Sequence, residues 1–484
     1  MAKGERAGLA GRLPFRLRDV NMTEGPVLSR MFVYTLPLMM SGILQLLYNA
    51  ADVAVVGRYA ADKQTSLAAV GSTGSLTNLI IGLFMGLSVG CCVVVSRYLG
   101  SGEKKNASET VHTSILTGLI LGVILAFVGI LFSKPLLRLM KSPDSVIDLA
   151  SLYMKIYFIG LPVSMLYNFG SSVLRAKGDT FFPLIVLVVS GSVNVSMNLI
   201  LVKGFHLDVA GVAAATVCSQ AVSAAMVLIH LSRLPGDDPC KLYFRRIGIR
   251  RDKLFKIIAV GIPAGAQGVL FSVSNVILQT AVNSLGDVAM AGNTAASNID
   301  GFIYIACNSV YHSAVSFTGQ NYGAHNFGRI KKVAWSSVFI VTAVGLAMGS
   351  VAFFFAKPLL SIYAPGAESA AVREYGLLRL RITALTYFMC GLMEVATGLL
   401  RGLNRSILPM SISFFGSCVL RVCWVYFLFY PYEYFNNMFW LWMTYPISWF
   451  ITAGAEFLVF FIVFRKITVR NRESGGEAGG VSAG

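Results

Sequence analysis

A carboxylate and three polar neighbours lie in an apolar stretch near the start of the chain. Residues 36–58, LPLMMSGILQLLYNAADVAVVGR, are apolar enough to enter a bilayer, yet they contain Gln45, Tyr48, Asn49 and Asp52. The spacing i, i+3, i+4 and i+7 places these four side chains along one face of a helix. An acid inside a membrane span normally faces the protein interior or a water-filled cavity and marks a path for ions or protons. The alternative is an acid that only reaches the membrane interface, but such an acid would need no amides beside it.

Three further polar residues, Ser190, Asn194 and Asn198, follow one another at intervals of four on a helix predicted over 181–202. They share a face, and counting from the helix ends places the two asparagines in the same half of the membrane as Asp52. We therefore expect the amides and the carboxylate to meet in one cavity. A carboxyl group in a poorly hydrated cavity accepts a proton more readily than one in water, so such an acid can exchange a proton. Alternatively, the asparagines only join helices by hydrogen bonds.

The second half of the chain carries a similar polar stripe without the acid. Gly268, Ser272, Asn275 and Gln279 lie on a predicted helix that corresponds to the first one, but Leu278 occupies the position equivalent to Asp52. The two halves are therefore chemically unequal.

Charged residues appear elsewhere in the predicted helices of the second half, among them Asp300, Glu394, Arg421 and Glu456. Asp300 and Arg421 fall at similar depth, and a pair between them would have a structural role. Glu394 and Glu456 lie nearer the inner end. Each either joins a cation site or reaches the inner membrane interface, and both possibilities stay open.

The composition indicates a polytopic membrane protein. Of the 484 residues, 55% are hydrophobic and only 13% are charged, against about one quarter charged in soluble domains. The eight cysteines and five histidines show no CxxC, HExxH or other metal-ligand spacing, so we expect no metal site and no cofactor. No clustered nucleophile and base are visible, which argues against an enzyme.

Twelve apolar segments have the length of about 20 residues that a bilayer span requires. The sequence therefore predicts an all-α polytopic membrane protein. The expected helices cover residues 31–57, 67–96, 112–133, 150–174, 181–202, 209–232, 254–285, 288–316, 333–356, 374–400, 407–430 and 437–464.

Lys and Arg are concentrated on one side of the predicted membrane. With the N-terminus in the cytoplasm, the inner segments hold 28 Lys and Arg and the outer loops hold seven. This distribution follows the positive-inside rule and predicts a multi-pass protein of the cytoplasmic membrane with both termini in the cytoplasm. Topology thus explains the net charge of +17, so membrane lipids are expected partners and nucleic acid is not. No segment indicates an obligate protein partner.

The chain also repeats itself. Pro37 recurs as Pro263 at an offset of 226, and FSKPLL at 132–137 recurs as FAKPLL at 355–360. We therefore predict two pseudo-symmetric six-helix lobes of the same orientation. Parallel repeats of this kind are typical of transporters, in which two bundles rock about a site between them. The predicted division is a basic cytoplasmic tail (1–30), an N-terminal lobe (31–232), a basic cytoplasmic linker (233–253), a C-terminal lobe (254–464) and a disordered cytoplasmic tail (465–484).

Methionine and aromatic residues are abundant, and a minority of them are expected to line a cavity between the lobes. The candidates are Met40, Tyr48, Phe271 and Tyr304. Such side chains suit planar, apolar or cationic small molecules through adaptable packing and cation–π contacts.

Several separated motifs resemble the multidrug and toxic compound extrusion (MATE) family. They occur in order over about residues 27–465: the stretch 36–58, LRAKGDTFFP at 174–183, GIPAGAQG at 261–268, AGNTAASNIDGF at 291–302 and FTGQNYGA at 317–324. The resemblance implies two six-helix lobes in a V and export of amphipathic, often cationic compounds against a proton or sodium gradient.

By position, Asp52 is similar to the first-helix aspartate that many members use for ion coupling, with Gln45, Asn49, Asn194 and Asn198 around it. Asn198 stands where proton-coupled members often have a second aspartate. The acid of the sodium-coupled branch is missing near Phe271. The candidates for ion-coupling residues in the second lobe are Asn275, Gln279, Asp300 and Glu394. The expected function is a secondary active antiporter that exchanges small molecules for H⁺ or Na⁺. A lipid-linked saccharide flippase of the same superfamily is the alternative, and it would need a more cationic cavity.

Overall fold

The computed structural model describes residues 19–60, 63–139, 144–366 and 369–479 as a bundle of long helices. The first half contains α1 (Val27–Tyr59), α2 (Lys63–Gly100), α3 (Lys104–Leu139), α4 (Asp144–Ile159), α5 (Leu161–Lys177), α6 (Phe181–Asn198), the π-helix η1 (Leu199–Gly204) and α7 (Asp208–Ser232). The second half contains α8 (Arg251–Asn283), α9 (Asp287–Gly323), α10 (Phe327–Phe354), α11 (Ala356–Tyr363), α12 (Ala370–Gly402), α13 (Ile407–Ser413), η4 (Phe414–Val419), α14 (Leu420–Trp424), η5 (Val425–Phe429) and α15 (Met438–Gly479). Short 3₁₀ turns cover Phe244–Arg246 and Glu433–Phe435.

The twelve predicted crossings are confirmed. Within the described residues, ten helical segments are long and apolar enough to span a membrane, and the bent pair α4 and α5 forms an eleventh. The twelfth is α9, whose 37 residues extend over ~55 Å at the helical rise of about 1.5 Å per residue. It is less apolar because its polar side chains are buried against α2 and α12 rather than exposed to lipid.

Three segments differ from the prediction. The helix expected over 150–174 is bent by 47° between α4 and α5, where Pro162 in the first turn of α5 cannot donate a backbone hydrogen bond. The helix expected over 407–430 includes two π-helical stretches. The tail expected to be disordered from residue 465 continues α15 through Gly479, and its first part, RKITVRNRES at 465–474, contains no proline or glycine that would interrupt a helix. Residues 480–484 lie outside the described part of the chain.

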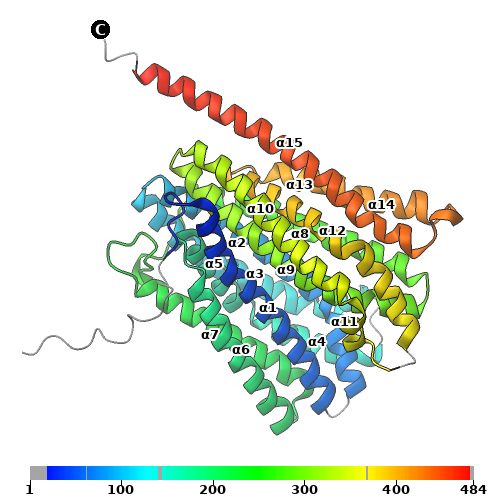
Figure 1. Cartoon of the computed structure of the whole chain (residues 1–484). Coiled ribbons are helices and arrows are strands. Elements are labelled where there is room, and N and C mark those ends of the chain that lie inside the picture. The colour runs from blue at the N-terminus through cyan, green and yellow to red at the C-terminus, as the bar shows by residue number, and fades with distance from the viewer. Residues whose placement is uncertain (1–18, 61–62, 140–143, 367–368, 480–484) are drawn as a thin grey trace, which may run out of the picture.

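The two halves form two lobes of corresponding helices (Figure 1). Both α1 and α8 have 33 residues and an internal proline, Pro37 and Pro263. The repeat is imperfect at the second proline motif, since α3 continues through Pro135 whereas the chain breaks at Phe355 before α11.

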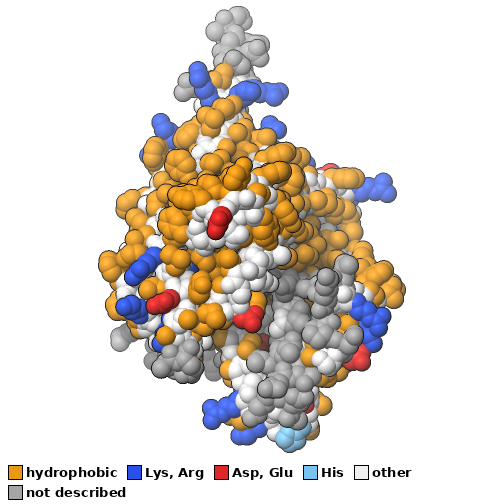
Figure 2. Space-filling model, turned by 90° about the vertical axis from the view of Figure 1, so that its right-hand side faces the viewer, with side chains coloured by type: hydrophobic (Ala, Val, Ile, Leu, Met, Phe, Trp, Pro, Cys, Tyr) orange, Lys and Arg blue, Asp and Glu red, His pale blue; other side chains and the backbone are white. Residues whose placement is uncertain are grey.

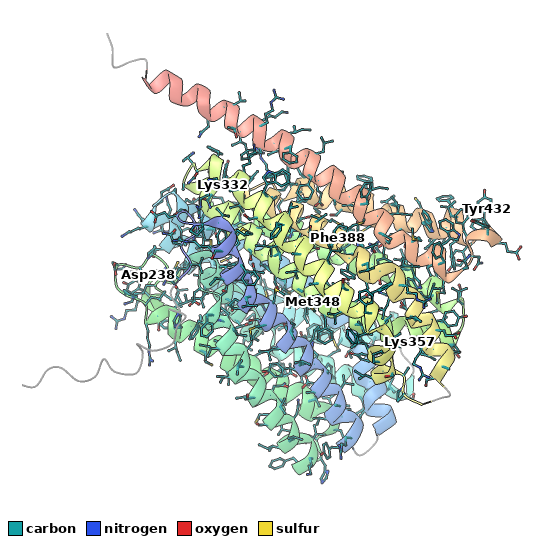
Figure 3. The ribbon with its side chains drawn as sticks, in the orientation of Figure 1. Asp238, Lys332, Met348, Lys357, Phe388 and Tyr432 are labelled. Carbon is teal, nitrogen blue, oxygen red and sulfur yellow. The ribbon has the colours of Figure 1, made fainter. Side chains whose placement is uncertain are left out.

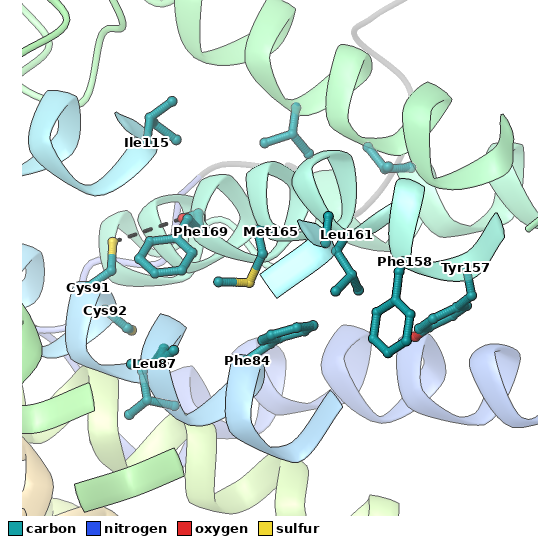
Figure 4. Packing of buried hydrophobic residues seen from close by; sticks show 14 of the residues in the cluster. Phe84, Leu87, Cys91, Cys92, Ile115, Tyr157, Phe158, Leu161, Met165 and Phe169 are labelled. Atoms are coloured by element: carbon teal, nitrogen blue, oxygen red, sulfur yellow. Dashed lines mark hydrogen bonds between the residues drawn. The ribbon is translucent and has the colours of Figure 1, made fainter. Parts of the chain in front are cut away.

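The core of the first lobe is a closely packed apolar cluster from α2, α3, α4 and α5. Figure 4 shows Phe84 of α2, Phe158 of α4, and Met165 and Phe169 of α5 within this cluster, with the Cys91 thiol directed at the Phe169 carbonyl oxygen 3.9 Å away. This packing fixes the helices that support the polar residues of the first lobe.

We call the end of the bundle that holds residues 19–26, 233–250 and 327–332 the basic end. In Figure 3 Asp238 and Lys332 mark this end, and Lys357 and Tyr432 mark the opposite one. Figure 2 views the opposite end, where hydrophobic side chains cover most of the described surface and Lys and Arg lie around its margin. The two ends thus differ in charge as the sequence predicts.

The lobes are joined at the basic end by close contact between α2 and α8. Gly86 packs against the backbone of Gly265, and Gly90 packs against the backbone of Ile257 and Gly261, without space for a Cβ at either position. Toward the opposite end, Gly71 and Gly74 of α2 have open space around them. Within the described residues, α2 and α8 therefore approach closely at Gly86 and Gly90 and have no such contact at Gly71 and Gly74.

Residues 19–25, which we call the N-terminal strap, cross the basic end and contact both lobes. The Lys177 ammonium pairs with Asp19 at 3.0 Å and with Asp238 at 2.8 Å, and the Val20 N–H donates to the Gly178 carbonyl at 3.1 Å. Gly178 has a φ of 114°, and a Cβ there would meet the Val20 backbone.

The other side of the strap is held by the second lobe. Arg329 donates to the carbonyl oxygens of Met22 at 2.9 Å, Glu24 at 2.5 Å and Gly25 at 2.7 Å. The Asn321 amide donates to the Met22 carbonyl at 3.0 Å, and the Met22 side chain is buried. The strap therefore links the first lobe to the second independently of α2 and α8.

The predicted pairing of Asp300 with Arg421 is wrong. Asp300 on α9 forms a buried ion pair with Arg379 on α12, with Nη2 to Oδ2 at 2.9 Å, and Thr383 donates a further hydrogen bond. Arg421 instead donates to Ser448 on α15 at 3.0 Å. Depth alone did not identify the partner, because α12 packs along α9 whereas α14 packs against α8 and α15.

We expect Asp300→Ala to destabilise the protein by ~3–5 kcal/mol, because removing one partner leaves the buried Arg379 charge uncompensated. The measurement is thermal unfolding of the purified protein in detergent. Asp148→Ala is the control, since its carboxylate pairs with Lys134 but is 81% exposed. Equal melting of the Asp300→Ala variant and the unmodified protein would show that the buried pair is not structural.

We also expect Arg329→Ala to loosen the N-terminal strap, since three carbonyl oxygens lose their donor. Amide hydrogen exchange measured by mass spectrometry should become faster over residues 19–25. Lys331→Ala provides the control because Lys331 is exposed on the same helix. Unchanged exchange in the Arg329→Ala variant would contradict a role of Arg329 in holding the strap.

Candidate functional site

Asp52 lies among polar groups from three helices of the first lobe. Its Oδ1 atom accepts a hydrogen bond of 2.5 Å from Asn198 Nδ2 on α6. The Asn194 amide on α6 and the Thr216 hydroxyl on α7, which donates to the Val212 carbonyl at 3.0 Å, also lie near the carboxylate. Asn194 and Asn198 are buried and Asp52 is half-buried. The structure thus brings together Asp52 and the two asparagines, as their spacing predicts.

The start of α6 is defined by its own sequence, which places the two asparagines. The Asp179 carboxylate accepts the backbone N–H groups of Phe181 at 3.1 Å and Phe182 at 2.9 Å, so it stabilises the first turn. From there the helix runs to Asn198, where the π-helix η1 begins. Such a change of helical pattern often occurs at functional positions, since it alters the direction of nearby side chains.

Among the described residues, the site contains a buried hydrogen-bond acceptor, the side-chain oxygen of Asn198, to which no group donates. Asn198 Nδ2 donates to Asp52 and also to Asn194 Oδ1 at 3.3 Å, whereas the buried Asn198 Oδ1 has no hydrogen-bond partner among the described residues. No Lys or Arg of the described part of the chain forms an ion pair with Asp52. A carboxylate beside an unsatisfied amide oxygen is an arrangement that a proton or a small cation can complete.

Two residues of the predicted stripe do not join this arrangement. Gln45 and Asn49 are exposed on α1, and no hydrogen bond in the described structure connects them to Asp52. Tyr48 is half-buried and its ring packs on Gly191 of α6, which leaves space for it because glycine has no side chain.

The second-lobe candidates are dispersed. Asn275 on α8 accepts a hydrogen bond of 3.5 Å from Arg421, and Gln279 bonds to Asn283 and Asn293. Asp300 is neutralised by Arg379, whereas Glu394 on α12 is buried and contacts Asn308 at 3.5 Å. Leu278, the counterpart of Asp52, is part of an apolar cluster. The second lobe therefore has no copy of the Asp52 site.

The four residues expected to line a substrate cavity are distributed over α1, α8 and α9. Met40 and Tyr304 are exposed, and Tyr48 and Phe271 are half-buried. A cavity of 290 Å³ and another of 520 Å³ both lie at the basic end, and neither is lined by these four residues. The described structure does not show them around one enclosed pocket.

The sequence analysis did not identify two residues near Asp52. Thr216 of α7 lies beside the Asp52 carboxylate, and Tyr153 of α4 lies close enough to Asp52 for an electrostatic interaction. Neither belongs to a polar stripe, so no periodicity could have identified them. Within the described residues, no group of three or more His, Cys, Asp or Glu side chains could hold a metal ion.

Comparison with known proteins identifies the family. Residues 37–200 and 263–427 match the family described as MatE. Probable multidrug resistance protein YoeA of Bacillus subtilis is 25% identical over 393 residues, which cover 80% of this chain and 83% of that protein. Multidrug export protein MepA of Staphylococcus aureus is 23% identical over 382 residues, which cover 79% and 83% respectively.

A solved structure has the same fold. The crystal structure of a MATE protein in complex with MaL6 aligns with a TM-score of 0.86 at 21% sequence identity, covering 93% of this chain and 99% of the other. The family match extends over both lobes and so includes the helices that carry Asp52 and Asn198. The chain is thus a multi-pass membrane protein and belongs to the MATE family of multidrug efflux transporters, whose members are transporters and not enzymes.

Proposed function

We propose that the protein is a secondary active antiporter of the cell membrane, with both termini in the cytoplasm. It exports amphipathic or cationic small molecules in exchange for H⁺ or Na⁺ by alternating access of its two lobes. The observation that carries this proposal is the Asp52 carboxylate, which accepts a hydrogen bond from the neutral Asn198 amide and pairs with no fixed cation in the described structure. A mobile cation can supply the missing charge.

The position of α1 supports coupling between Asp52 and lobe movement. Near the basic end α1 contacts the second lobe, where Tyr34 donates to Ser316 at 2.8 Å and Thr35 bonds to Ser313 at 2.6 Å. Toward the opposite end α1 carries Asp52 and contacts α6 of its own lobe. Binding of a cation at Asp52 changes the charge between α1 and α6, so the access state with higher affinity for the cation becomes more populated.

The substrate class is supported by chemistry and by the relatives. The two relatives are named as a probable multidrug resistance protein and a multidrug export protein. Exposed Met40 and Tyr304 provide an adaptable side chain and an aromatic ring, which suit apolar or cationic molecules of varied shape.

A lipid-linked saccharide flippase is not favoured. Such a protein needs free cationic side chains in its cavity to bind a diphosphate. The buried arginines Arg379, Arg401 and Arg421 of the second lobe are instead engaged by hydrogen bonds or an ion pair within the protein.

The central test is efflux from proteoliposomes with an imposed proton or sodium gradient, applied separately, over a panel of cationic dyes and antibiotics. One gradient should drive efflux by the unmodified protein, and Asp52→Asn should reduce it to the level of protein-free vesicles. Asp148→Asn, at an exposed carboxylate, should remain active. If neither gradient drives transport, antiport is excluded, and if Asp52→Asn remains active, another group couples the ion.

A second test addresses the neighbour of Asp52. Asn198→Leu should reduce gradient-driven efflux by ~tenfold or more, because a hydrogen bond to a charged group contributes about 1.5–3 kcal/mol. Ser192→Ala on the same helix is the control, since that exposed hydroxyl bonds only to its own backbone among the described contacts. Full activity of a folded Asn198→Leu protein would separate Asn198 from the coupling site.

A further inference from the structure

The second lobe contains a buried cluster of two carboxylates and one guanidinium that the proposed coupling at Asp52 does not use. Glu456 on α15 is 0% exposed, Glu394 on α12 is 8% exposed and Arg401 on α12 is 6% exposed. None of the three forms an ion pair within 4.0 Å among the described residues. If all were ionised, the cluster would carry one uncompensated negative charge in a membrane interior, which is strongly unfavourable.

Both carboxylates are held by neutral groups. Glu456 Oε1 accepts from the Ser413 hydroxyl on α13 and Oε2 accepts from the Thr397 hydroxyl on α12, each at 2.9 Å. Glu394 Oε2 accepts from Asn308 on α9 at 3.5 Å. These donors satisfy the oxygens geometrically but supply no positive charge.

Hydrogen bonds connect Glu456 to the contact between the lobes. Gln267 on α8 donates to Ser413 at 2.9 Å, Arg401 Nη2 donates to Gln267 at 2.6 Å, and Arg401 Nη1 donates to the Tyr311 hydroxyl. Tyr311 on α9 belongs to the same buried cluster as Leu87 and Val95 of the first lobe. The Arg401 Nε atom has no hydrogen-bond partner among the described residues, so the guanidinium has capacity for one more bond.

We propose that Glu456 and Glu394 form a second cation site that binds one proton, and that this proton stabilises the closed basic end. With the proton bound, Arg401 balances the remaining carboxylate and keeps its bond to Tyr311. When the proton leaves, the second negative charge attracts Arg401 away from Tyr311, which weakens the contact between the lobes. A proton is the favoured occupant because both acids are buried without an ion-pair partner within 4.0 Å, which favours the neutral form, and because no metal-ligand cluster is present in the described residues.

Other titratable or charged groups also face the two acids. From the helices packed around them, these are Tyr304, Cys307 and Tyr311 of α9 and Cys390 of α12, while His312 of α9 lies near Arg401 and Arg421 of α14 lies near Cys390. Arg401 lies close enough for an electrostatic interaction with both acids, whereas Arg421 bonds to Ser448, so Arg401 is the cation that can respond to the charge of the acids.

Infrared spectroscopy of the purified protein tests the site. A pH titration should show the C=O stretching band of a protonated carboxyl group that remains in Asp52→Asn and is lost from Glu456→Gln. If Glu456→Gln leaves the titrating band unchanged, the proposed proton site is overturned. Because Asp52→Asn is measured in parallel, a negative result for the proton site at Glu456 is distinguishable from a negative result for the coupling proposed at Asp52.

Distance measurements between spin labels test the connection to the lobes. Labels at Lys105→Cys on α3 and Lys331→Cys on α10, both exposed at the basic end, report its closure, with exposed Cys218 and Cys423 replaced by serine. Raising the pH through the titration of the site should lower the ratio of closed to open molecules by up to about tenfold per pH unit, the limit for one linked proton. Glu456→Gln, a mimic of the protonated acid, should stay closed across this range.

Tyr311→Phe is the second variant, because it retains both acids and removes the hydroxyl that Arg401 binds. It should keep the infrared band while losing most of the pH dependence of closure. Full pH dependence in either Glu456→Gln or Tyr311→Phe would overturn the connection. Replacement of potassium by sodium at fixed pH should change neither measurement, and closure that follows sodium instead of pH would overturn the proton as occupant.

Discussion

The close contact of α2 with α8 is the constraint on which the arrangement of the two lobes depends. Backbones approach this closely only where side chains are absent, and Gly86, Gly90 and Gly265 meet that condition. In a membrane, helices gain little from burying apolar surface against one another, so close backbone packing and interhelical hydrogen bonds provide much of their association. The lobes are therefore joined at one end and can diverge at the other.

Other contacts between the lobes lie at the same end. The N-terminal strap connects Lys177 of the first lobe with Arg329 of the second, and Tyr34 and Thr35 of α1 bond to α9. Because these polar contacts lie at one end of the bundle, water can replace the lost hydrogen-bond partners when the contacts separate. A rocking transporter needs such a reversible closure.

The buried acids of the two lobes differ in what balances their charge. Asp300 is permanently neutralised by Arg379, so its role is structural. Asp52 and Glu456 are surrounded by amides and hydroxyls, and in the described structure neither has a fixed cation in contact. Only acids of this second kind leave room for a mobile ion, which is why we assign ion binding to them and not to Asp300.

Sequence alone determined the number of helices, the twofold repeat, the charge difference between the ends and the meeting of Asp52 with Asn194 and Asn198. These features follow from hydropathy, from internal similarity and from helical spacing, which fix the face and the depth of a side chain. Tertiary structure decided the rest: Arg379 rather than Arg421 faces Asp300, Gln45 and Asn49 stay exposed, and Thr216 joins the carboxylate. The physical reason is that a partner depends on which helix packs alongside and how each helix is rotated, and these are set by side-chain packing across the bundle, which the periodicity of a single segment does not contain.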